Sequence, residues 1–276
     1  MLFRSDDRYV VEMPFKPEIA GNPILGNSKD IAAKRLNSLW KRLESDATMR
    51  ALYSEFLSEY HKLSHIKKLH EDIYSDEGYY LPHHGVLKPS STTTKLRVVF
   101  NATAKSSNGK SLNDLLCKGG VLQDDIFSIM IRFRKHTYAF SADIQKMFRQ
   151  IEINPKQTNY QRILWKADIM SPIQVYELKT VTYGTACAPY LATKVLQQLA
   201  LDERKDFPLA SNVLLHDVYM DDCLSGSSDI NEFHCLTPEL TKLLLRGGMS
   251  LHKWCTNLAP SAESQVFRER KGWLCG

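Results

Sequence analysis

The most informative segment of the chain is Leu214-Leu215-His216-Asp217-Val218-Tyr219-Met220-Asp221-Asp222-Cys223-Leu224. Two adjacent acids, Asp221 and Asp222, interrupt an otherwise apolar segment whose composition favours a strand, and we expect a hairpin over residues 213–225. Neighbouring carboxylates repel each other, so a folded protein keeps both charged only where cations or water surround them. A bound divalent metal ion meets that need, and a solvent-exposed hairpin turn is the alternative.

A third carboxylate, Asp143, lies at the end of a strand predicted over residues 137–143. Side chains alternate along a strand, so one face should carry Tyr138, Phe140 and Ala142, and the other Ala139, Ser141 and Asp143. If this strand lies beside the hairpin, the three acids form an oxygen-rich site suited to Mg²⁺. Capping a helix is the alternative role for Asp143. Two ions about 3.5 to 4 Å apart support in-line displacement at phosphorus, in polymerases and nucleases alike.

The composition is that of a folded protein. With 276 residues, 43% of them hydrophobic and 24% charged, the chain can form one large domain or two small ones. The net charge of +5 suits a nucleic-acid partner without requiring one. Six cysteines without a C-x-x-C pair indicate neither a zinc ribbon nor a disulfide framework. Without a signal peptide or a segment of about 20 apolar residues, we expect an intracellular protein, cytoplasmic or nuclear, with no membrane partner.

The first half of the chain predicts a lead-in, two helices and a strand. Prolines and glycines in residues 1–26 favour extended structure. Apolar residues at helical spacing predict two amphipathic helices. Their expected inward residues are Leu36, Leu39, Trp40 and Leu43 in the first, and Leu52, Phe56, Tyr60 and Leu63 in the second. We then expect a strand at 95–100, a short helix at 112–116 and a helix capped by Asp124 and Asp125. The inward residues of that helix are expected to be Ile126, Ile129, Met130 and Phe133.

After His136 the patterns predict the strand at 137–143, a strand-rich segment at 162–179, a helix at 189–201, the hairpin, a helix at 238–246 and a strand at 249–254. Pro189 and Pro238 fit first-turn positions of the two helices. The order approximates β-α-β-β-α-β, an α+β arrangement. Adjacent His83 and His84 would point to opposite faces of a strand, so we do not expect them to share a metal ion.

Several linked motifs resemble one protein family. Tyr219-Met220-Asp221-Asp222 resembles the polymerase signature of reverse transcriptases, and residues 140–148 resemble their first aspartate motif. Residues 80–86, 95–101, 111–116 and 133–134 resemble, in order and spacing, the Bel/Pao class of LTR retrotransposons. The resemblance runs from residue 8 to residue 257. Retroviral enzymes have glutamine where Tyr183 stands and serine where Ala188 stands, whereas an aromatic residue before the glycine is familiar in Bel/Pao sequences.

The resemblance implies the right-hand fold of polymerases. That fold is α+β, with a ferredoxin-like β-α-β-β-α-β palm, fingers and, in this chain, an N-terminal helical segment ahead of them. We expect the lead-in and helical segment over 1–78, fingers over 79–136, a palm over 137–260 with a fingers portion near 150–180, and a tail over 261–276. A thumb is expected to be largely absent, and protease, RNase H and integrase sequences are not recognisable.

The resemblance also implies roles for individual residues. Asp143, Asp221 and Asp222 would be the catalytic ligands of two Mg²⁺ ions, or of Mn²⁺. Lys95 and Arg97 would hold the incoming triphosphate, although solvated surface cations are the alternative. Phe148 would exclude ribonucleotides as a steric gate, although core packing is the alternative. The other residues expected to contact substrate or template are Tyr183, Gly184, Tyr219, Met220 and Lys253. For Gly184 a simple helix lead-in stays open, and for Lys253 a surface position.

The implied activity is RNA-directed DNA synthesis from dNTPs by a retrotransposon enzyme, on an RNA or DNA template with a DNA primer. One alternative is a catalytically inactive or truncated retroelement remnant that at most binds nucleic acid. Another is a two-metal nuclease or an RNA-templated RNA polymerase, which Phe148 and the fingers motifs disfavour. The sequence leaves the oligomeric state open.

Overall fold

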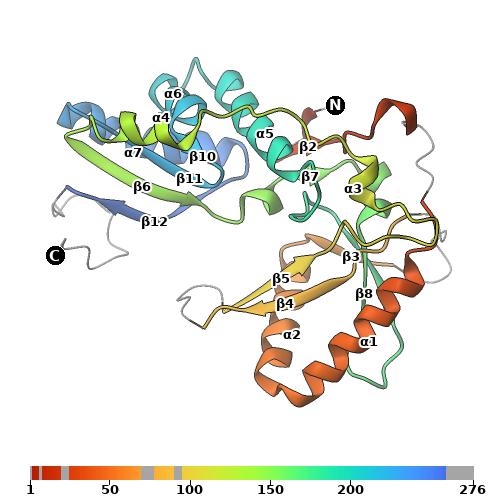
Figure 1. Ribbon diagram of the computed structural model, residues 1–276. Helices are drawn as coiled ribbons and strands as arrows, with labels where there is room; N and C mark the ends of the chain where they lie inside the picture. Colours follow the sequence, from red (N-terminus) through yellow and green to blue (C-terminus); the bar gives the residue numbers. More distant parts are fainter. Residues whose placement is uncertain (1, 6–7, 20–24, 70–77, 90–94, 259–276) are drawn as a thin grey trace. The chain divides into compact units, whose positions relative to one another are not determined.

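The structure is a computed structural model that describes residues 2–5, 8–19, 25–69, 78–89 and 95–258 (Figure 1). The chain folds into two compact units, and each is described by itself. The first unit contains Val10–Gly119 and Glu152–Ala188. The second contains Leu2–Tyr9, Gly120–Ile151 and the chain from Pro189 onward. The tail expected over 261–276 lies outside the described residues.

The first unit begins with the two amphipathic helices that the sequence predicts, α1 (Lys29–Ser45) and α2 (Ala47–Lys62). Asp46 between them caps α2, because its side chain accepts a hydrogen bond from the Met49 backbone N–H at 2.8 Å. The expected inward face of α1 is confirmed. The buried face of α2 consists of Met49, Tyr53, Leu57 and Tyr60. The expectation that Leu63 points inward is wrong, because it lies past the last turn and is 38% exposed.

Short antiparallel strands pack with these helices. β4 (His83–Leu87) and β5 (Leu96–Phe100) form a hairpin, so the strand expected at 95–100 is present. β3 (Ile66–Lys68), β9 (Gln174–Leu178) and β8 (Arg162–Trp165) form a sheet in that order.

The connections of the first unit contain the remaining elements. Val10 and Val11 of β2 (Arg8–Val11) pair in parallel with β7 (Glu152–Ile153). α3 (Leu112–Leu115) matches the short helix expected there and is closed at its N-terminus by a capping box of Ser111 and Asp114. The 3₁₀ helices are η1 (Pro17–Ile19) and η3 (Pro155–Gln161).

An aromatic cluster forms the centre of the first unit. Tyr53 of α2 stacks on Trp165 of β8 with ring centroids 5.0 Å apart, and Trp40 of α1 lies 5.2 Å from the same Trp165 ring. His83 of β4 is buried in this cluster, 6.3 Å from Trp165. The rings join both helices to strands β4 and β8, so the hairpin β4–β5 rests on a rigid base.

A four-stranded antiparallel sheet forms the second unit, in the order β10-β11-β6-β12. The strands are β6 (Tyr138–Ile144), β10 (Val218–Tyr219), β11 (Asp222–Ser227) and β12 (Leu251–Thr256). The helices are α4 (Ile126–Phe133), α5 (Ala188–Asp202), α6 (Pro208–His216) and α7 (Ile230–Arg246), and the 3₁₀ helix η2 (Met147–Gln150) follows β6. Strand β1 (Leu2–Ser5), near the N-terminus, also belongs to this unit. In chain order, β6, α5, β10, β11, α7 and β12 reproduce the predicted β-α-β-β-α-β order, with α6 added.

The helices cover one face of this sheet. Figure 1 shows α4, α6 and α7 on the same side of β6 and β11. On that side Phe140 is 1% exposed, and its ring lies 6.0 Å from the ring of Phe233 on α7. The alternation expected along β6 is therefore confirmed, and Asp143 faces away from the helices.

Two boundaries in the second unit differ from the sequence predictions. Residues 213–216, expected to begin the hairpin, form the last turn of α6, which has Pro208 in its first turn. Helix α7 begins at Ile230 and not at Pro238, because Asp229 caps it by accepting hydrogen bonds from the N–H groups of Asn231 and Glu232. Pro238 therefore lies inside the helix.

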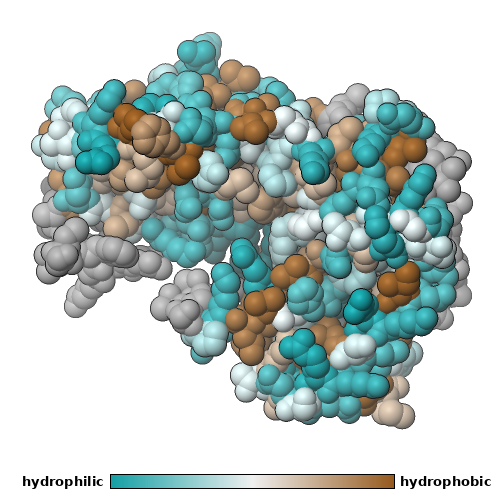
Figure 2. Space-filling view, viewed as in Figure 1, coloured by the Kyte–Doolittle hydropathy of each residue, from teal (hydrophilic) through white to brown (hydrophobic). Residues whose placement is uncertain are grey.

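Helix α4 is more exposed than expected. Ile129 is buried, whereas Ile126 and Met130, which were expected to point inward, are 42% and 41% exposed. Asp125 caps the helix as predicted, but Asp124 forms an ion pair with Arg132 and does not cap. Figure 2 shows apolar atoms gathered over α4. Within the described ranges, no helix has both the length and the apolar character that crossing a bilayer requires.

Candidate active site

The hairpin of β10 and β11 turns over Met220 and Asp221. Tyr219 pairs with Asp222 across the hairpin, which leaves a loop of these two residues. Met220 has a φ of 58°, a left-handed conformation that is uncommon for a residue with a side chain. Its N–H donates to the Gln123 side-chain oxygen at 3.2 Å, so the tip of the hairpin is held by the segment before α4.

The hairpin brings the three predicted acids together. Asp222 lies directly opposite Asp143 in the antiparallel pairing of β11 with β6. Residues opposed in this way have Cα atoms about 4.5 to 5.5 Å apart. The Ile144 N–H donates to the Asp221 carbonyl at 2.7 Å, which joins the hairpin tip to the end of β6. The carboxylates of Asp143, Asp221 and Asp222 therefore share one edge of the sheet.

This proximity is electrostatically unfavourable without a cation. Partial burial raises the pKa of Asp222, and the charges of Asp221 and Asp143 raise it further, while Lys253 lowers it. Three carboxylates from the hairpin and the neighbouring strand β6 are a donor set that suits Mg²⁺, and a divalent ion would remove their repulsion. The residues present therefore fit a divalent metal.

Both oxygens of Asp143 already have partners on β12. Oδ2 accepts a hydrogen bond from Lys253 Nζ at 3.1 Å, and Oδ1 is hydrogen-bonded to Nε2 of His252, which pairs with Asp143 across the strands. In the described ranges, no three acidic, histidine or cysteine side chains are already arranged as the ligands of one metal ion. Sharing one ion therefore requires the three carboxylates to shift closer together than they lie here. Sequence reasoning expected Lys253 near this site and missed His252.

Backbone strain is concentrated around the acids. Lys146 and Lys253, like Met220, have a positive φ, at 53° and 54°. Ser64, in the first unit, is the remaining non-glycine residue of this kind in the described part of the chain. Such conformations cost about 1 to 3 kcal/mol each and persist where the surrounding structure enforces them, often at functional sites. Three of the four strained residues therefore lie at the same edge of the sheet as the carboxylates.

A buried carboxylate that sequence reasoning missed anchors the base of the hairpin. Asp217 accepts a hydrogen bond from Ser225 Oγ at 2.7 Å and another from Arg132 Nε at 3.1 Å. The Arg132 Nη2 donates to Asp124 at 2.8 Å and also to the His216 carbonyl. Helix α4 thus holds the base of the hairpin through Arg132 and Asp217. The only signal in the sequence was a further acid in the apolar segment that carries Asp221.

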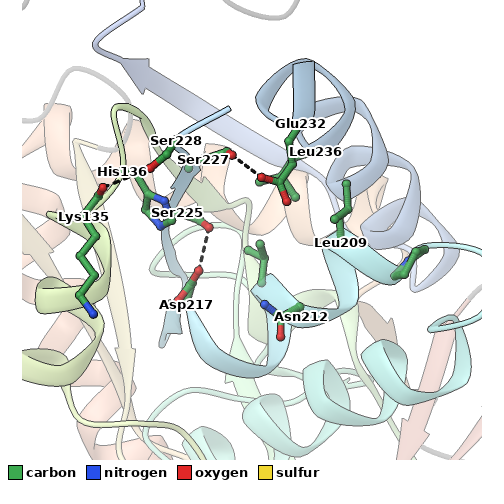
Figure 3. Close-up of a pocket in the computed structure, with 13 residues that line it drawn as sticks. Lys135, His136, Leu209, Asn212, Asp217, Ser225, Ser227, Ser228, Glu232 and Leu236 are labelled. Atoms are coloured by element: carbon green, nitrogen blue, oxygen red, sulfur yellow. Dashed lines mark hydrogen bonds between the residues drawn. The ribbon is translucent and has the colours of Figure 1, made fainter. Parts of the chain in front are cut away.

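Figure 3 shows Asp217 and Ser225 facing each other beside a cavity of about 550 Å³ that is lined by α6, α7 and the end of β11. Ser227 donates to Glu232 on the far wall of this cavity. The cavity lies beyond the hairpin base, toward the end of β11 opposite to Asp222. It is therefore separate from the carboxylate edge.

Replacing Asp217 with alanine should destabilise the protein. Arg132 and Ser225 lose their shared acceptor, and because Arg132 is one-third exposed we expect a loss of about 2 kcal/mol rather than the larger cost of a fully buried pair. Urea unfolding measures the difference. Asp206→Ala is the matched control, since Asp206 is exposed in the same unit and should change stability by less than about 0.5 kcal/mol. Equal stabilities of the two variants would contradict the anchoring role.

The other predicted residues are distributed over both units. Phe148 lies in η2 of the second unit and is half-buried. Lys95 and Arg97 lie in the first unit and are both exposed; Arg97 lies in β5, and Lys95 comes directly before this strand. Tyr183 also belongs to the first unit, with its ring 5.4 Å from that of Phe100.

Gly184 has a structural reason to be glycine. Its φ is +100°, and a Cβ atom there would lie 2.2 Å from the Phe100 carbonyl oxygen. Its own carbonyl accepts a hydrogen bond from the Asn113 side-chain amide at 3.0 Å, and the Asn113 oxygen accepts from the Ala186 N–H at 2.7 Å. Packing against β5 therefore requires the glycine independently of any contact with a base pair.

Gly184→Ala should reduce the unfolding free energy by at least about 2 kcal/mol, because the added methyl group meets backbone and the left-handed conformation becomes strained. Thermal or urea unfolding would measure this loss. Gly120→Ala is the control, since a Cβ atom at Gly120 meets nothing within 4 Å. If the two variants are equally stable, the close approach to Phe100 is not a real constraint.

Residues 88–260 match a protein-family model described as "Reverse transcriptase (RNA-dependent DNA polymerase)". Among solved structures, the chain is similar to a foamy viral protease-reverse transcriptase in complex with double-stranded DNA, at 17% identity and a TM-score of 0.52, over 70% of this chain and 28% of that one. It is also similar to a mutant of the Prototype Foamy Virus protease-reverse transcriptase, at 16% identity and a TM-score of 0.56, over 75% of this chain and 24% of that one.

These likenesses show the mixed α+β fold alone, because the identities are low. The chain spans about a quarter of the length of either foamy virus protein. No curated protein sequence matches it significantly.

Proposed function

The chain belongs to the reverse transcriptase (RNA-dependent DNA polymerase) family, and we propose that it extends a DNA primer on an RNA or DNA template from dNTPs. The family is one of nucleotidyltransferases whose members generally use divalent metals. The observation that carries the proposal is the pairing of Asp222 with Asp143 beside Asp221 at the hairpin tip, because it assembles three acids from distant parts of the chain. A structural role alone would not require such mutually repelling side chains.

In the proposed mechanism Asp143, Asp221 and Asp222 hold two Mg²⁺ ions, for which Mn²⁺ can substitute. When bound, such ions lower the pKa of the primer 3′-hydroxyl and neutralise the departing pyrophosphate. His252 and Lys253 orient the Asp143 carboxylate from β12, and Lys253 also supplies a positive charge beside the acids. The chain's own contribution is therefore the positioning of charge, which dominates catalysis of phosphoryl transfer.

The remaining sequence-derived roles belong to the same proposal. Lys95 and Arg97 bind the incoming triphosphate, since a guanidinium offers a bidentate fork and an ammonium a compact charge. Phe148 lies under the sugar of the dNTP and excludes a 2′-hydroxyl. The residues proposed to contact the nascent base pair or the primer end are Tyr183, Gly184, Tyr219 and Met220.

The biological setting is also a proposal. We assign the first unit to the N-terminal segment and fingers and the second mainly to the palm of a Bel/Pao-type retrotransposon polymerase that works in the cytoplasm or nucleus. The motif order along the sequence supports the Bel/Pao assignment. A template and primer as partners are supported by the double-stranded DNA bound to the similar foamy virus protein.

Primer extension tests the function. The chain should incorporate dTTP on poly(rA) primed with oligo(dT) in Mg²⁺ or Mn²⁺, and incorporation should require the template. Absence of incorporation in both metals, with a folded protein, would favour a remnant that at most binds nucleic acid. Release of nucleotides from the primer without extension would instead indicate a two-metal nuclease.

A further inference from the structure

Helix α4 of the second unit exposes an apolar surface. Phe127 is 71% exposed, and Ile126, Met130 and Ile131 on the same helix are exposed as well. Ile126 and Met130 are four residues apart, as are Phe127 and Ile131, so the two pairs form neighbouring rows on one side of the helix. We call the surface of these side chains the α4 patch (Figure 2). Exposed apolar patches of this kind mark interaction sites in soluble proteins.

The second unit holds α4 in place without using the patch. Ile129 is the buried residue of the helix. Arg132 donates to Asp217 at the base of the hairpin at 3.1 Å, and Gln123, just before the helix, accepts from the Met220 N–H at 3.2 Å. Polar contacts at both ends therefore fix α4 against the hairpin. The α4 patch is a preformed surface, which loses little conformational entropy when a partner docks on it.

The charges around the patch are distributed in a self-complementary way. Asp124 and Asp125 lie at the N-terminal end of α4, and Arg134 and Lys135 lie at its C-terminal end. Both cations are exposed, and within the described part of the chain neither has an ion-pair partner. A uniformly acidic or basic partner would therefore meet like charge at one end of the helix.

A second copy of α4 meets opposite charge at both ends. If two copies pack antiparallel about a two-fold axis, the acidic end of each helix comes beside the basic end of the other. Both charged pairs lie about one to two helical turns from the middle of the patch, so the ends align when the apolar rows are in contact. The rows of one helix can then pack between the rows of the other.

Docking on α4 leaves the carboxylate edge open. The helices of this unit cover the face of the sheet that carries Phe140, whereas Asp143 faces away from them (Figure 1). A partner on the outer side of α4 therefore does not cover the face of Asp143.

We propose that the α4 patch is an interface between two copies of this chain, with their α4 helices packed antiparallel. The patch exposes on the order of 350 Å² of side chain in each copy. That is less than the roughly 800 Å² per partner of a standard stable interface, so the dimer is transient. We expect a dissociation constant on the order of 10 to 100 µM.

Sedimentation velocity of the nuclease-treated full chain tests the proposal. Between about 1 and 300 µM protein, the weight-average mass should rise from 31.6 kDa toward twice that value. Phe127→Asp should weaken association at least about 10-fold, because the two-fold axis places the new charge in the contact twice. Leu245→Asp is the matched control, since it makes the same change at an exposed apolar residue of α7 in the same unit. It should associate like the wild type.

The charged ends have a test of their own. Arg134→Glu/Lys135→Glu places acids beside acids at both ends and should weaken association about 10-fold at low salt and less at high salt. Arg204→Glu/Lys205→Glu makes the same change in net charge at two exposed residues that follow α5. This control should retain wild-type association. Equal losses in both double variants would indicate a general charge effect and overturn the antiparallel arrangement.

Three further outcomes would overturn the proposal. A wild-type chain that stays monomeric over the whole concentration range has no such interface. Association that survives Phe127→Asp lies elsewhere on the molecule. A monomer that pellets with phosphatidylcholine vesicles containing phosphatidylserine, and loses this binding in Phe127→Asp, uses the patch for a lipid surface instead. Mass is measured without template or dNTP, so the result is independent of whether the chain extends a primer.

Discussion

Asp221→Asn should abolish primer extension and leave the fold intact. Asp221 is half-exposed at the hairpin tip, where its side chain adds little to the core, and the hydrogen bond to Ile144 uses its backbone carbonyl. An amide keeps the size of the side chain but removes the charge that a metal ion requires. We expect at least a 1000-fold lower kcat/KM, which corresponds to about 4 kcal/mol of lost transition-state stabilisation.

The comparison needs a variant with the same chemical change elsewhere. Asp206→Asn fits, because Asp206 is exposed in the same unit, and no side-chain interaction is found for it within the described residues. It should retain full activity. Circular dichroism and urea unfolding of both variants should match the wild type. Extension by Asp221→Asn at wild-type rates would refute the ligand role of Asp221.

Phe148→Ala should admit ribonucleotides. In the proposed site the ring lies against the sugar, so its removal opens space for a 2′-hydroxyl while dNTP use continues. The ratio of kcat/KM for dTTP to that for UTP should fall by about 10- to 100-fold, or about 1.4 to 2.7 kcal/mol. Single-nucleotide extension with each substrate measures this ratio.

Phe148→Tyr is the control for the gate, since it retains the ring and should retain discrimination. The half-buried position of Phe148 in η2 also permits a packing role. Packing alone predicts a lower unfolding free energy for Phe148→Ala with an unchanged dTTP to UTP ratio. That combination would reject the gate.

The sequence predicted that Asp143 and Asp222 would meet if their two strands are neighbours. Both acids interrupt apolar, strand-forming segments, and the period of two along β6 determines that Asp143 faces away from Phe140. The pairing in the structure places them directly opposite. Local patterns determine the face of the strand and the position of the turn, because a strand's alternation and a short hairpin restrict the geometry strongly. That the two strands are neighbours was a condition of the sequence analysis, and the structure meets it.

The boundaries of α6 and α7 could not be predicted in the same way. The apolar residues Val213, Leu214 and Leu215 suit a helix as well as a strand, and only the contacts of the folded unit decide between them. Pro238 resembles a helix start, but the cap at Asp229 nine residues earlier extends the helix through it. Tertiary packing of Phe233 against β6 favours the longer helix.

The contacts that orient the site are long-range. Arg132 and Asp217 are 85 positions apart, and His252 and Asp143 are 109 positions apart. No spacing rule within a helix or strand links residues so distant. Likewise, Ile126 and Met130 on α4 are exposed because, among the described residues, no other element of the fold packs over them. An amphipathic pattern in the sequence does not predict which apolar residues stay exposed.

The loop of Met220 and Asp221 has a consequence for how this sequence can diverge. Because Tyr219 is registered against Asp222, and Asp222 against Asp143, one inserted or deleted residue in this turn would transfer every following side chain of β11 to the opposite face. Homologues should therefore differ in length between β6 and β10, where loops and helices absorb extra residues, while the turn itself keeps a constant length. Insertion scanning across residues 217–224 would test this: variants with an insertion in the turn should fail to fold or to function.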